Sequence, residues 1–566
     1  MRCHSLSASF TAIAISASFF VAGLSGLARP AFAATRADAE KDPVLKAMLA
    51  ELDRSRDHLQ LKDFAKPFFI QYRLEDIEDY QAKSDYGATL GDQFRHQRLA
   101  RVTVRVGDYK MDSSTARGDG AVELASLDND PEAMRAGLWL ATDQAYKAAL
   151  AAYAHKQAQL KQVQTPPQQD DFSHESPTIS LGEPVKLDLD HAAQSAWMKR
   201  MDEASGLYRT DATLKSSQHD VQYATAVFHA RAVTTYLVNS EGTVVRKGQS
   251  SYEESFATGT QAADGMHIDR SYGSDGLTLK DLDPAEAFNQ HAKALVASLA
   301  ELRTAPLVEE EYHGPVLFSA DAASDTIHDL VASSVTAARP ELGTEARTKG
   351  AFASSYHARV LPDFLDVTDD PALKTFDGKT LVGAYAIDDE GVPAQQVKLI
   401  TDGRLENYLL GREPIRDFPN SNGHARAAIT GPARPSISVL DVTSHTGLSD
   451  AELNQKLLAL AKDRGLKNVY YVATMGPEQT PRLLYRISTE GDTAGKRTLV
   501  RGATLDEVDQ RALRSGVIAA GQKPFIANYN GAVLESVLAP ALLFDDVTVK
   551  RANEKNDKLP FYPPPD

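Results

Sequence analysis

The chain has 566 residues, 42% of them hydrophobic, which is enough to bury the cores of two or more domains without cross-links. Its formal net charge is −16, and such an acidic surface repels a phosphate backbone, so binding to nucleic acid is not expected. The one cysteine, Cys3, lies at the start, so the rest of the chain offers neither a disulfide nor a thiolate for catalysis or metal binding.

Residues 1–33 have the pattern of a secretory signal peptide. Arg2 precedes an uncharged run over 5–28, and the following ARPAFA places Ala31 and Ala33 at the small-residue positions of a cleavage site. A retained anchor is the alternative, because the run approaches the roughly 20 residues that span a bilayer. The Ala-Phe-Ala end favours cleavage, and no later stretch is apolar enough to span a membrane. We therefore expect a soluble mature protein, periplasmic or secreted, whose net charge falls from −16 to −18 with the loss of two arginines.

After the leader, a first domain over residues 34–306 is predicted to mix helices with antiparallel strands. Val44 and Leu52 fall on one helical face, and Asp130 with a following proline is typical of a helix start. The predicted elements, in chain order, are a helix over 42–59, strands over 67–87 and 98–114, a helix over 130–162, a polar surface loop over 163–184, strands over 221–261 and a helix over 283–302.

A second domain is predicted over residues 307–566. Its elements are a helix over 324–335, a hairpin over 395–411 that turns at Asp402-Gly403, a capped helix over 449–465, and strands over 468–476, 481–491, 497–505 and 539–551. The acids of DDEGVPA, residues 388–394, are expected to face solvent or to cap backbone amides. The whole pattern indicates an α+β fold of two domains with mainly antiparallel sheets flanked by helices.

Five blocks of the second half, read in order, resemble one known family. They are LPDFLDVTDDP (361–371), YAIDDEGVPAQQVKLITDGRLENYLLGRE (385–413), NSNGHAR (420–426), VRGATL (500–505) and APALLFDDVTV (539–549). Their order and spacing are similar to those of the C-terminal domain of the TldD/PmbA metallopeptidase family. The resemblance implies a two-domain protein that acts on peptides or proteins. It also implies that a zinc-bearing member works with a related subunit that lacks the metal site.

The resemblance further implies a helix with His-Glu-x-x-x-His and a later cysteine as the third zinc ligand. His328 matches the first histidine, Asp329 replaces the glutamate, Ser333 replaces the second histidine, and no cysteine occurs in 521–531, where it would be expected. A serine hydroxyl is a poor ligand for zinc. The shorter aspartate displaces a general base by about 1 Å, which can cost about a hundredfold in rate. The short HExxH pattern also fails, at Ala332.

Two interpretations therefore stay open for His328 and Asp329. In the first, His328 binds a metal ion, with zinc as the candidate, and Asp329 is the catalytic base of a rearranged peptidase site. Substitute ligands would then come from nearby histidines and acids, namely His313, His357, His424 and the acids of 309–313. In the second, His328 is an ordinary residue at the edge of a core-facing helical stripe. The chain is then a non-catalytic subunit that binds peptides or completes a zinc-bearing partner in a homo- or hetero-oligomer.

Overall fold

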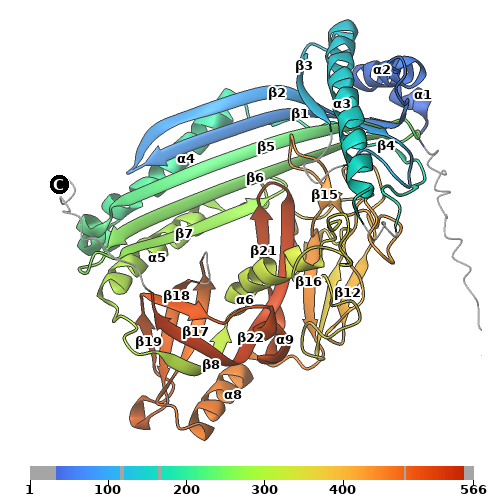
Figure 1. Ribbon diagram of the computed structural model, residues 1–566. Helices are drawn as coiled ribbons and strands as arrows, with labels where there is room; N and C mark the ends of the chain where they lie inside the picture. The colour runs from blue at the N-terminus through green and yellow to red at the C-terminus, as the bar shows by residue number, and fades with distance from the viewer. Residues whose placement is uncertain (1–33, 115–119, 164–168, 477–479, 553–566) are drawn as a thin grey trace, which may run out of the picture.

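The computed structural model describes residues 34–552 except 115–119, 164–168 and 477–479. The predicted leader, residues 1–33, lies outside the described residues. The described part forms two units, each a large sheet with helices packed against it (Figure 1). The prediction of an α+β fold with mainly antiparallel sheets is thus confirmed. The boundary predicted between residues 306 and 307 stays a prediction.

The N-terminal sheet has the strand order β3-β2-β1-β5-β6-β4, and β7 also pairs with β6. Its strands are β1 (Pro67–Asp85), β2 (Ala88–Val106), β3 (Ala121–Ala125), β4 (Ile179–Leu181), β5 (Tyr223–Asn239), β6 (Val244–Gln261) and β7 (His267–Gly276). β1 pairs antiparallel with both β2 and β5 along most of its length. The β1–β2 turn is made by Tyr86 and Gly87, both with positive φ (52° and 80°), as a two-residue hairpin requires.

Helices cover one face of this sheet at its two ends (Figure 1). They are α1 (Arg36–Ala39), α2 (Pro43–His58), α3 (Pro131–Leu160), α4 (His191–Thr210) and α5 (Ala285–Thr304), with a 3-10 segment η1 (Ala212–Asp220). Asp130 caps α3 as predicted, and Asp42 caps α2 in the same way; each accepts two backbone N–H bonds. The helix α4 was not predicted, because few of its residues are buried and its apolar stripe is short.

The loop predicted at the surface over 163–184 is buried in part. Phe172 packs against the rings of Phe69 and Tyr109, at centroid distances of 4.8 Å and 6.1 Å. Asp171 forms ion pairs with Lys156 and with Arg339 of the C-terminal unit. The prediction was wrong for this part, because aromatic and charged partners from distant segments enclose it.

The C-terminal sheet has the order β13-β12-β9-β16-β22-β8-β17-β18-β19, with β20 and β21 also paired to β22. Its strands are β8 (Tyr312–Phe318), β9 (Leu365–Asp369), β12 (Val397–Thr401), β13 (Arg404–Leu405), β16 (Val439–Ser444), β17 (Asn468–Met475), β18 (Pro481–Ser488), β19 (Arg497–Val500), β20 (Ala503–Asp506), β21 (Val517–Asn530) and β22 (Leu534–Arg551). Two pairings, β16–β22 and β8–β17, are parallel, and the other pairings are antiparallel. Two small hairpins accompany this sheet, β10 (Thr375–Phe376) with β11 (Lys379–Thr380) and β14 (Ala425–Arg426) with β15 (Arg434–Pro435).

The described part of this unit has four α-helical segments, a π-turn and a short 3-10 segment. They are α6 (Ala320–Ile327), the π-turn η2 (His328–Ala332), α7 (Ser333–Val335), α8 (Asp450–Asp463), the 3-10 segment η4 (Gly491–Thr493) and α9 (Gln510–Ser515). The predicted helix over 449–465 is confirmed, with a capping box at Ser449 and Gly465 in the left-handed region. The predicted hairpin turns at Asp402-Gly403, both with positive φ. None of the helices in the described part of the chain has the length and apolar character needed to cross a bilayer.

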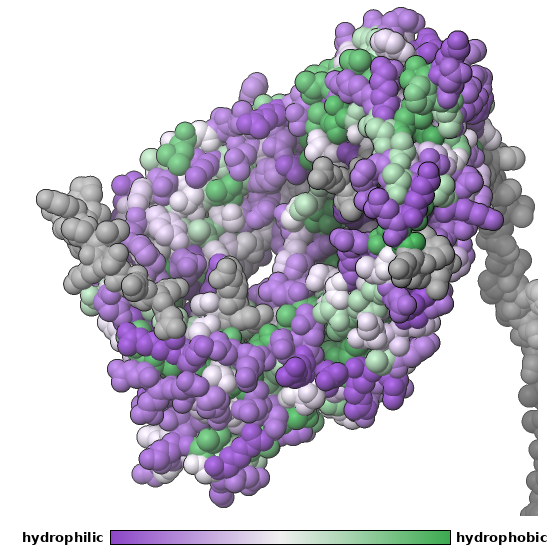
Figure 2. Space-filling view, viewed as in Figure 1, coloured by the Kyte–Doolittle hydropathy of each residue, from purple (hydrophilic) through white to green (hydrophobic). Residues whose placement is uncertain are grey.

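Buried charges join the two units. Asp389 is 8% exposed and pairs with Lys247 of β6 at 2.6 Å, and Arg412 pairs with Glu241 at 2.6 Å. Asp388 is 1% exposed and accepts the backbone N–H groups of Val392 and Ala425. Of the two environments expected for the acids of 388–394, capping of backbone amides is therefore the one observed for Asp388. Beyond these contacts the molecule is hollowed between the N-terminal sheet and the C-terminal unit (Figure 2).

Candidate functional site

His328 and Asp329 open a π-turn that continues directly from α6. In an α-helix of 3.6 residues per turn, residues five apart point about 140° away from each other. A π-turn, whose hydrogen bonds join residues five apart, brings such residues to the same side, and π-turns are frequent at functional sites. The turn over 328–332 therefore has the geometry that a five-residue ligand spacing requires, although Ser333 stands at the second position.

Three side chains hold the imidazole of His328 in place. Nε2 lies 2.9 Å from Glu535 Oε2, and Nδ1 lies 3.7 Å from Asp329 Oδ1. The ring stacks on Tyr529 of β21, with centroids 4.0 Å apart and an interplanar angle of 18°. Glu535 is itself fixed by the hydroxyl of Ser436, which donates to its second oxygen. A carboxylate on one ring nitrogen is how proteins usually orient a metal-binding histidine.

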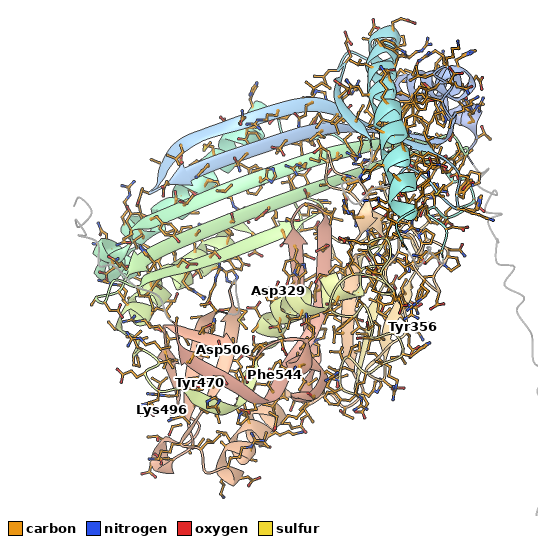
Figure 3. All side chains as sticks on the ribbon, in the orientation of Figure 1. Asp329, Tyr356, Tyr470, Lys496, Asp506 and Phe544 are labelled. Atoms are coloured by element: carbon orange, nitrogen blue, oxygen red, sulfur yellow. The ribbon has the colours of Figure 1, made fainter. Side chains whose placement is uncertain are left out.

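The carboxylates around His328 favour its protonated form. Burial alone would lower the pKa of His328, but the hydrogen bond to Glu535 and the charges of Glu535 and Asp329 outweigh it and raise the pKa above its ordinary value. Asp329 is 53% exposed at its side chain. Figure 3 shows it on the side of the π-turn that faces the opening between the two units. An imidazole that tends to be charged competes poorly for a metal ion, because metal binding requires the neutral ring.

Further acids lie on the same helix, one turn and two turns before Asp329. Burial and the nearby Asp325 raise the pKa of Asp321 to about 6. Burial also raises the pKa of Asp325, although the hydroxyl of Tyr529 donates to it at 2.9 Å. From β7 of the other unit comes Arg270, whose guanidinium lies near Asp321 and whose pKa is lowered by burial and by Arg482. Acids of α6 and arginines of β7 and β18 thus lie within electrostatic range of one another, where the two units approach.

The histidines considered as substitute ligands do not gather around His328. His313 pairs with Glu311 at 3.0 Å and His357 pairs with Glu406 at 2.8 Å, both at exposed positions. His424 lies in a loop but is fully buried, with Nε2 3.1 Å from Asp369. Within the described residues, no group of three metal-ligating side chains includes His328. The residues present therefore do not fit a zinc ion at this position. Metal binding by His328 and catalysis by Asp329 stay predictions.

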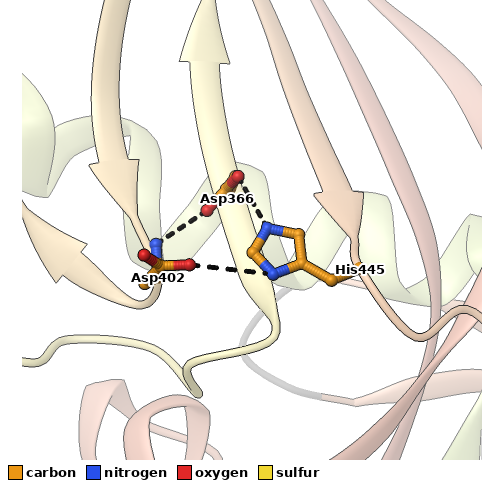
Figure 4. Close-up of side chains that lie close together, drawn as sticks. All are labelled: Asp366, Asp402 and His445. Atoms are coloured by element: carbon orange, nitrogen blue, oxygen red, sulfur yellow. Dashed lines mark hydrogen bonds and ion pairs between the residues drawn. The ribbon is translucent and has the colours of Figure 1, made fainter.

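One group of three possible metal ligands does occur in the described part of the chain: Asp366, Asp402 and His445 (Figure 4). His445 Nε2 lies 2.8 Å from Asp366 Oδ2, and Nδ1 lies 3.7 Å from Asp402 Oδ1. The other oxygen of Asp366 accepts the backbone N–H of Asp402 at 2.7 Å. Sequence reasoning missed this group because only the turn at Asp402 has a local signal. Its contacts tie the end of β9 to the β12–β13 turn and to the residue after β16.

The model of the PmbA/TldA metallopeptidase C-terminal domain matches residues 310–551. No curated protein matches. TldE from Thermococcus kodakarensis has a similar structure, with a TM-score of 0.56, 13% identity, and coverage of 89% of this chain and 100% of that chain.

Two further solved structures carry the description of a putative modulator of DNA gyrase. The one from Thermotoga maritima has a TM-score of 0.55 and 14% identity, and it covers 89% of this chain and 100% of that chain. The one from Bacteroides thetaiotaomicron has a TM-score of 0.56 and 12% identity, with 89% and 98% covered. At these identities the structural likeness shows the fold, while the match of the family model identifies the C-terminal domain. Residues 310–551 therefore belong to the family of PmbA/TldA metallopeptidase C-terminal domains, and the solved structures share the fold of the chain.

Proposed function

We propose that this protein is an exported, non-catalytic member of its family that binds polypeptide in the opening between its two units and completes a zinc-bearing relative. The observation that carries the proposal is the environment of His328. Its two ring nitrogens face Glu535 and Asp329, and Ser333 stands where a second imidazole is needed. Such a site lacks the three ligands that catalytic zinc requires.

The walls of the opening support binding of a polypeptide. Acids of α6 lie within electrostatic range of arginines of β7 and β18, so groups of opposite charge meet where the two units approach each other. Arg482 also donates to Ser271 at 2.9 Å across the two units. A peptide backbone carries both donors and acceptors, and its termini carry both charges, so a wall of each sign suits it.

Hydrolysis of peptides through a rearranged metal site is the second candidate. It is favoured by the exposed carboxylate of Asp329, which lies beside an imidazole already oriented by Glu535. A substrate or a partner chain would then have to supply the missing ligand.

The experiment that separates the two candidates uses the purified mature chain, alone and mixed with a zinc-bearing relative from the same envelope. Zinc content and chelator-sensitive cleavage of unstructured peptides are measured for the wild type and for His328→Ala. We expect no stoichiometric zinc and no cleavage by the chain alone. We expect cleavage by the mixture, which His328→Ala leaves largely intact. Zinc bound to the chain alone and lost in His328→Ala would instead establish the rearranged site.

The partner is tested by isolation of the tagged chain from the native envelope, followed by sizing. A stable complex with a relative would bury on the order of 2,000 Å² or more and would persist through purification. A monomer that recovers no relative would contradict the partner role.

A further inference from the structure

The helix-covered face of the N-terminal sheet leaves a polar gap between its two helical clusters. Tyr72 and Leu74 of β1 pack in the core of α2 and α3, and Tyr80 of β1 packs in the core of α4. Asp76 and Glu78 lie between them on the same face, because alternate residues of a strand share a face. Side chains from β2 and β5 border this gap, since Asp76 pairs in register with Arg98 and with Thr234.

A pocket of about 220 Å³ occupies this gap. This is more than ten times the roughly 10–15 Å³ that one water needs. Its walls are the first turn of α2, with Asp42 and Pro43, and the segment that contains Val185 and Lys186. It lies on the face of the sheet opposite the C-terminal unit, which is contacted by odd-numbered residues of β1 such as Arg73. The pocket is therefore separate from the opening that contains His328.

Tyr236 of β5 lines this pocket with a hydroxyl that has no partner. The residue is only 5% exposed, but its hydroxyl is open to the pocket, and no hydrogen bond joins it to another described residue. Burial, followed by the charges of Asp42 and Asp76, raises the pKa of Tyr236 to about 12, so the hydroxyl keeps its proton. A hydroxyl that is open to the pocket can bond to water or to another polar group there. A polar atom of a bound molecule would be such a group.

Most charges at the pocket are already neutralised by ion pairs, namely Asp42 with Arg246 at 2.6 Å and Asp76 with Arg98 at 2.7 Å. Two are not. Among the described residues, Glu78 and Lys186 have no ion-pair partner. One oxygen of Glu78 accepts the backbone N–H of Leu187 at 2.8 Å, so the other oxygen is left to contact a ligand. The groups left for a ligand are thus one carboxylate oxygen, one ammonium and one hydroxyl.

We propose that this pocket binds a small zwitterion, of the class of a free α-amino acid or a dipeptide. The ammonium of the ligand pairs with the carboxylate of Glu78, and the carboxylate of the ligand pairs with the ammonium of Lys186. The hydroxyl of Tyr236 bonds to a polar atom of the ligand between these two groups.

Calorimetric titration of the purified mature chain tests this assignment. The probes are L-alanyl-L-alanine, N-acetyl-L-alanine, which lacks the ammonium, and L-alaninamide, which lacks the carboxylate. We expect saturable binding of the dipeptide and binding about tenfold weaker for each single-charge probe, because a hydrogen bond to a charged group supplies roughly that factor. The variants Lys186→Met and Tyr236→Phe are each expected to bind the dipeptide about tenfold more weakly than the wild type does.

Three controls keep the result specific. Lys199→Met removes an ammonium that is 78% exposed and away from the pocket, and it should leave binding unchanged. Tyr236→Phe should leave the melting temperature unchanged, because its hydroxyl has no bond to lose. His328→Ala should bind the dipeptide normally, which separates this pocket from the opening. The assignment is overturned if no dipeptide binds, if both pocket variants bind as the wild type does, or if L-alaninamide binds as tightly as the dipeptide.

Discussion

Arg412 is the single side chain whose loss should most weaken the junction of the two units. It is 1% exposed, and its guanidinium makes a two-pronged contact with Glu241, at 2.6 Å and 2.9 Å. It also donates to the carbonyl of Ser173 at 2.6 Å and lies 3.9 Å from the ring centroid of Phe172. In Arg412→Met the side chain keeps its length, but Glu241 retains only the hydroxyl of Tyr109.

The expected magnitude follows from the burial of the pair. Removing one partner of a buried ion pair costs about 3–5 kcal/mol. Glu241 is 15% exposed and can gain some water, so we expect the low end, about 3 kcal/mol. The control Arg56→Met removes a guanidinium that is 51% exposed, and it should cost less than about 1 kcal/mol.

Urea denaturation of the full chain, followed by circular dichroism, measures both variants. Because Arg412 joins the units, its loss should also split a single transition into two. A loss of less than about 1 kcal/mol, with one transition preserved, would refute the view that buried charge holds the junction.

The other predictions concern His328 and the leader. The pKa of folded His328 is raised, so the stability that its protonation contributes is complete below the unfolded pKa of about 6.5 and is lost as pH rises through the folded pKa. The melting temperature of the wild type, relative to that of His328→Gln, should therefore fall over that pH range. A difference in melting temperature that does not depend on pH would contradict this prediction. The variant Ser333→His should bind zinc in equilibrium dialysis where the wild type does not, because the π-turn places residues 328 and 333 on one side. If the variant binds no more zinc than the wild type, the turn does not align these two residues. Mass spectrometry should find the mature chain starting at Ala34 outside the cytoplasm, and an intact segment 1–33 on membrane-bound protein would favour the anchor.

The parts of the fold that could be predicted have signals within a few residues. Asp42 and Asp130 precede prolines at helix starts, Ser449 forms a capping box, and Asp402-Gly403 suits a tight turn. Each depends on the backbone conformation of its own segment. The helix α4 lacks a comparable apolar stripe, since only five of its residues are buried, and it was missed.

The candidate site could be predicted only for the residues on one helix. His328 and Asp329 were found by their own segment, but Glu535, Tyr529 and Ser436, which hold the imidazole, lie about 100 to 200 residues away in the chain. The π-turn has no signal in composition, because the residues that form it also form α-helices. Only the pairing of β22 with β21, and their contact with α6, brings these groups together.

The burial of the acids of 388–394 could not be predicted for the same reason. A run of acids is ordinarily solvated, and charged residues are seldom fully buried without a partner. Asp389 is buried because Lys247 reaches it from the other unit and Arg426 lies beside it. Whether an acidic side chain is buried thus depends on whether a cation lies beside it in the fold. The separation of the two residues along the chain does not reveal this contact.

The arrangement around His328 shows that the metal ligands can be missing while the side chains that hold the histidine are still in place. A helix that had become merely structural would have no need for a carboxylate held against the histidine, since a half-buried acid is costly without a cation or hydrogen-bond donors. Yet Glu535, 17% exposed at its side chain, receives both the imidazole and the hydroxyl of Ser436. These contacts fix a charged imidazole on the wall of the opening. Both of its N–H groups face carboxylates, of Glu535 and Asp329, so these carboxylates meet the charge of the imidazole without any metal.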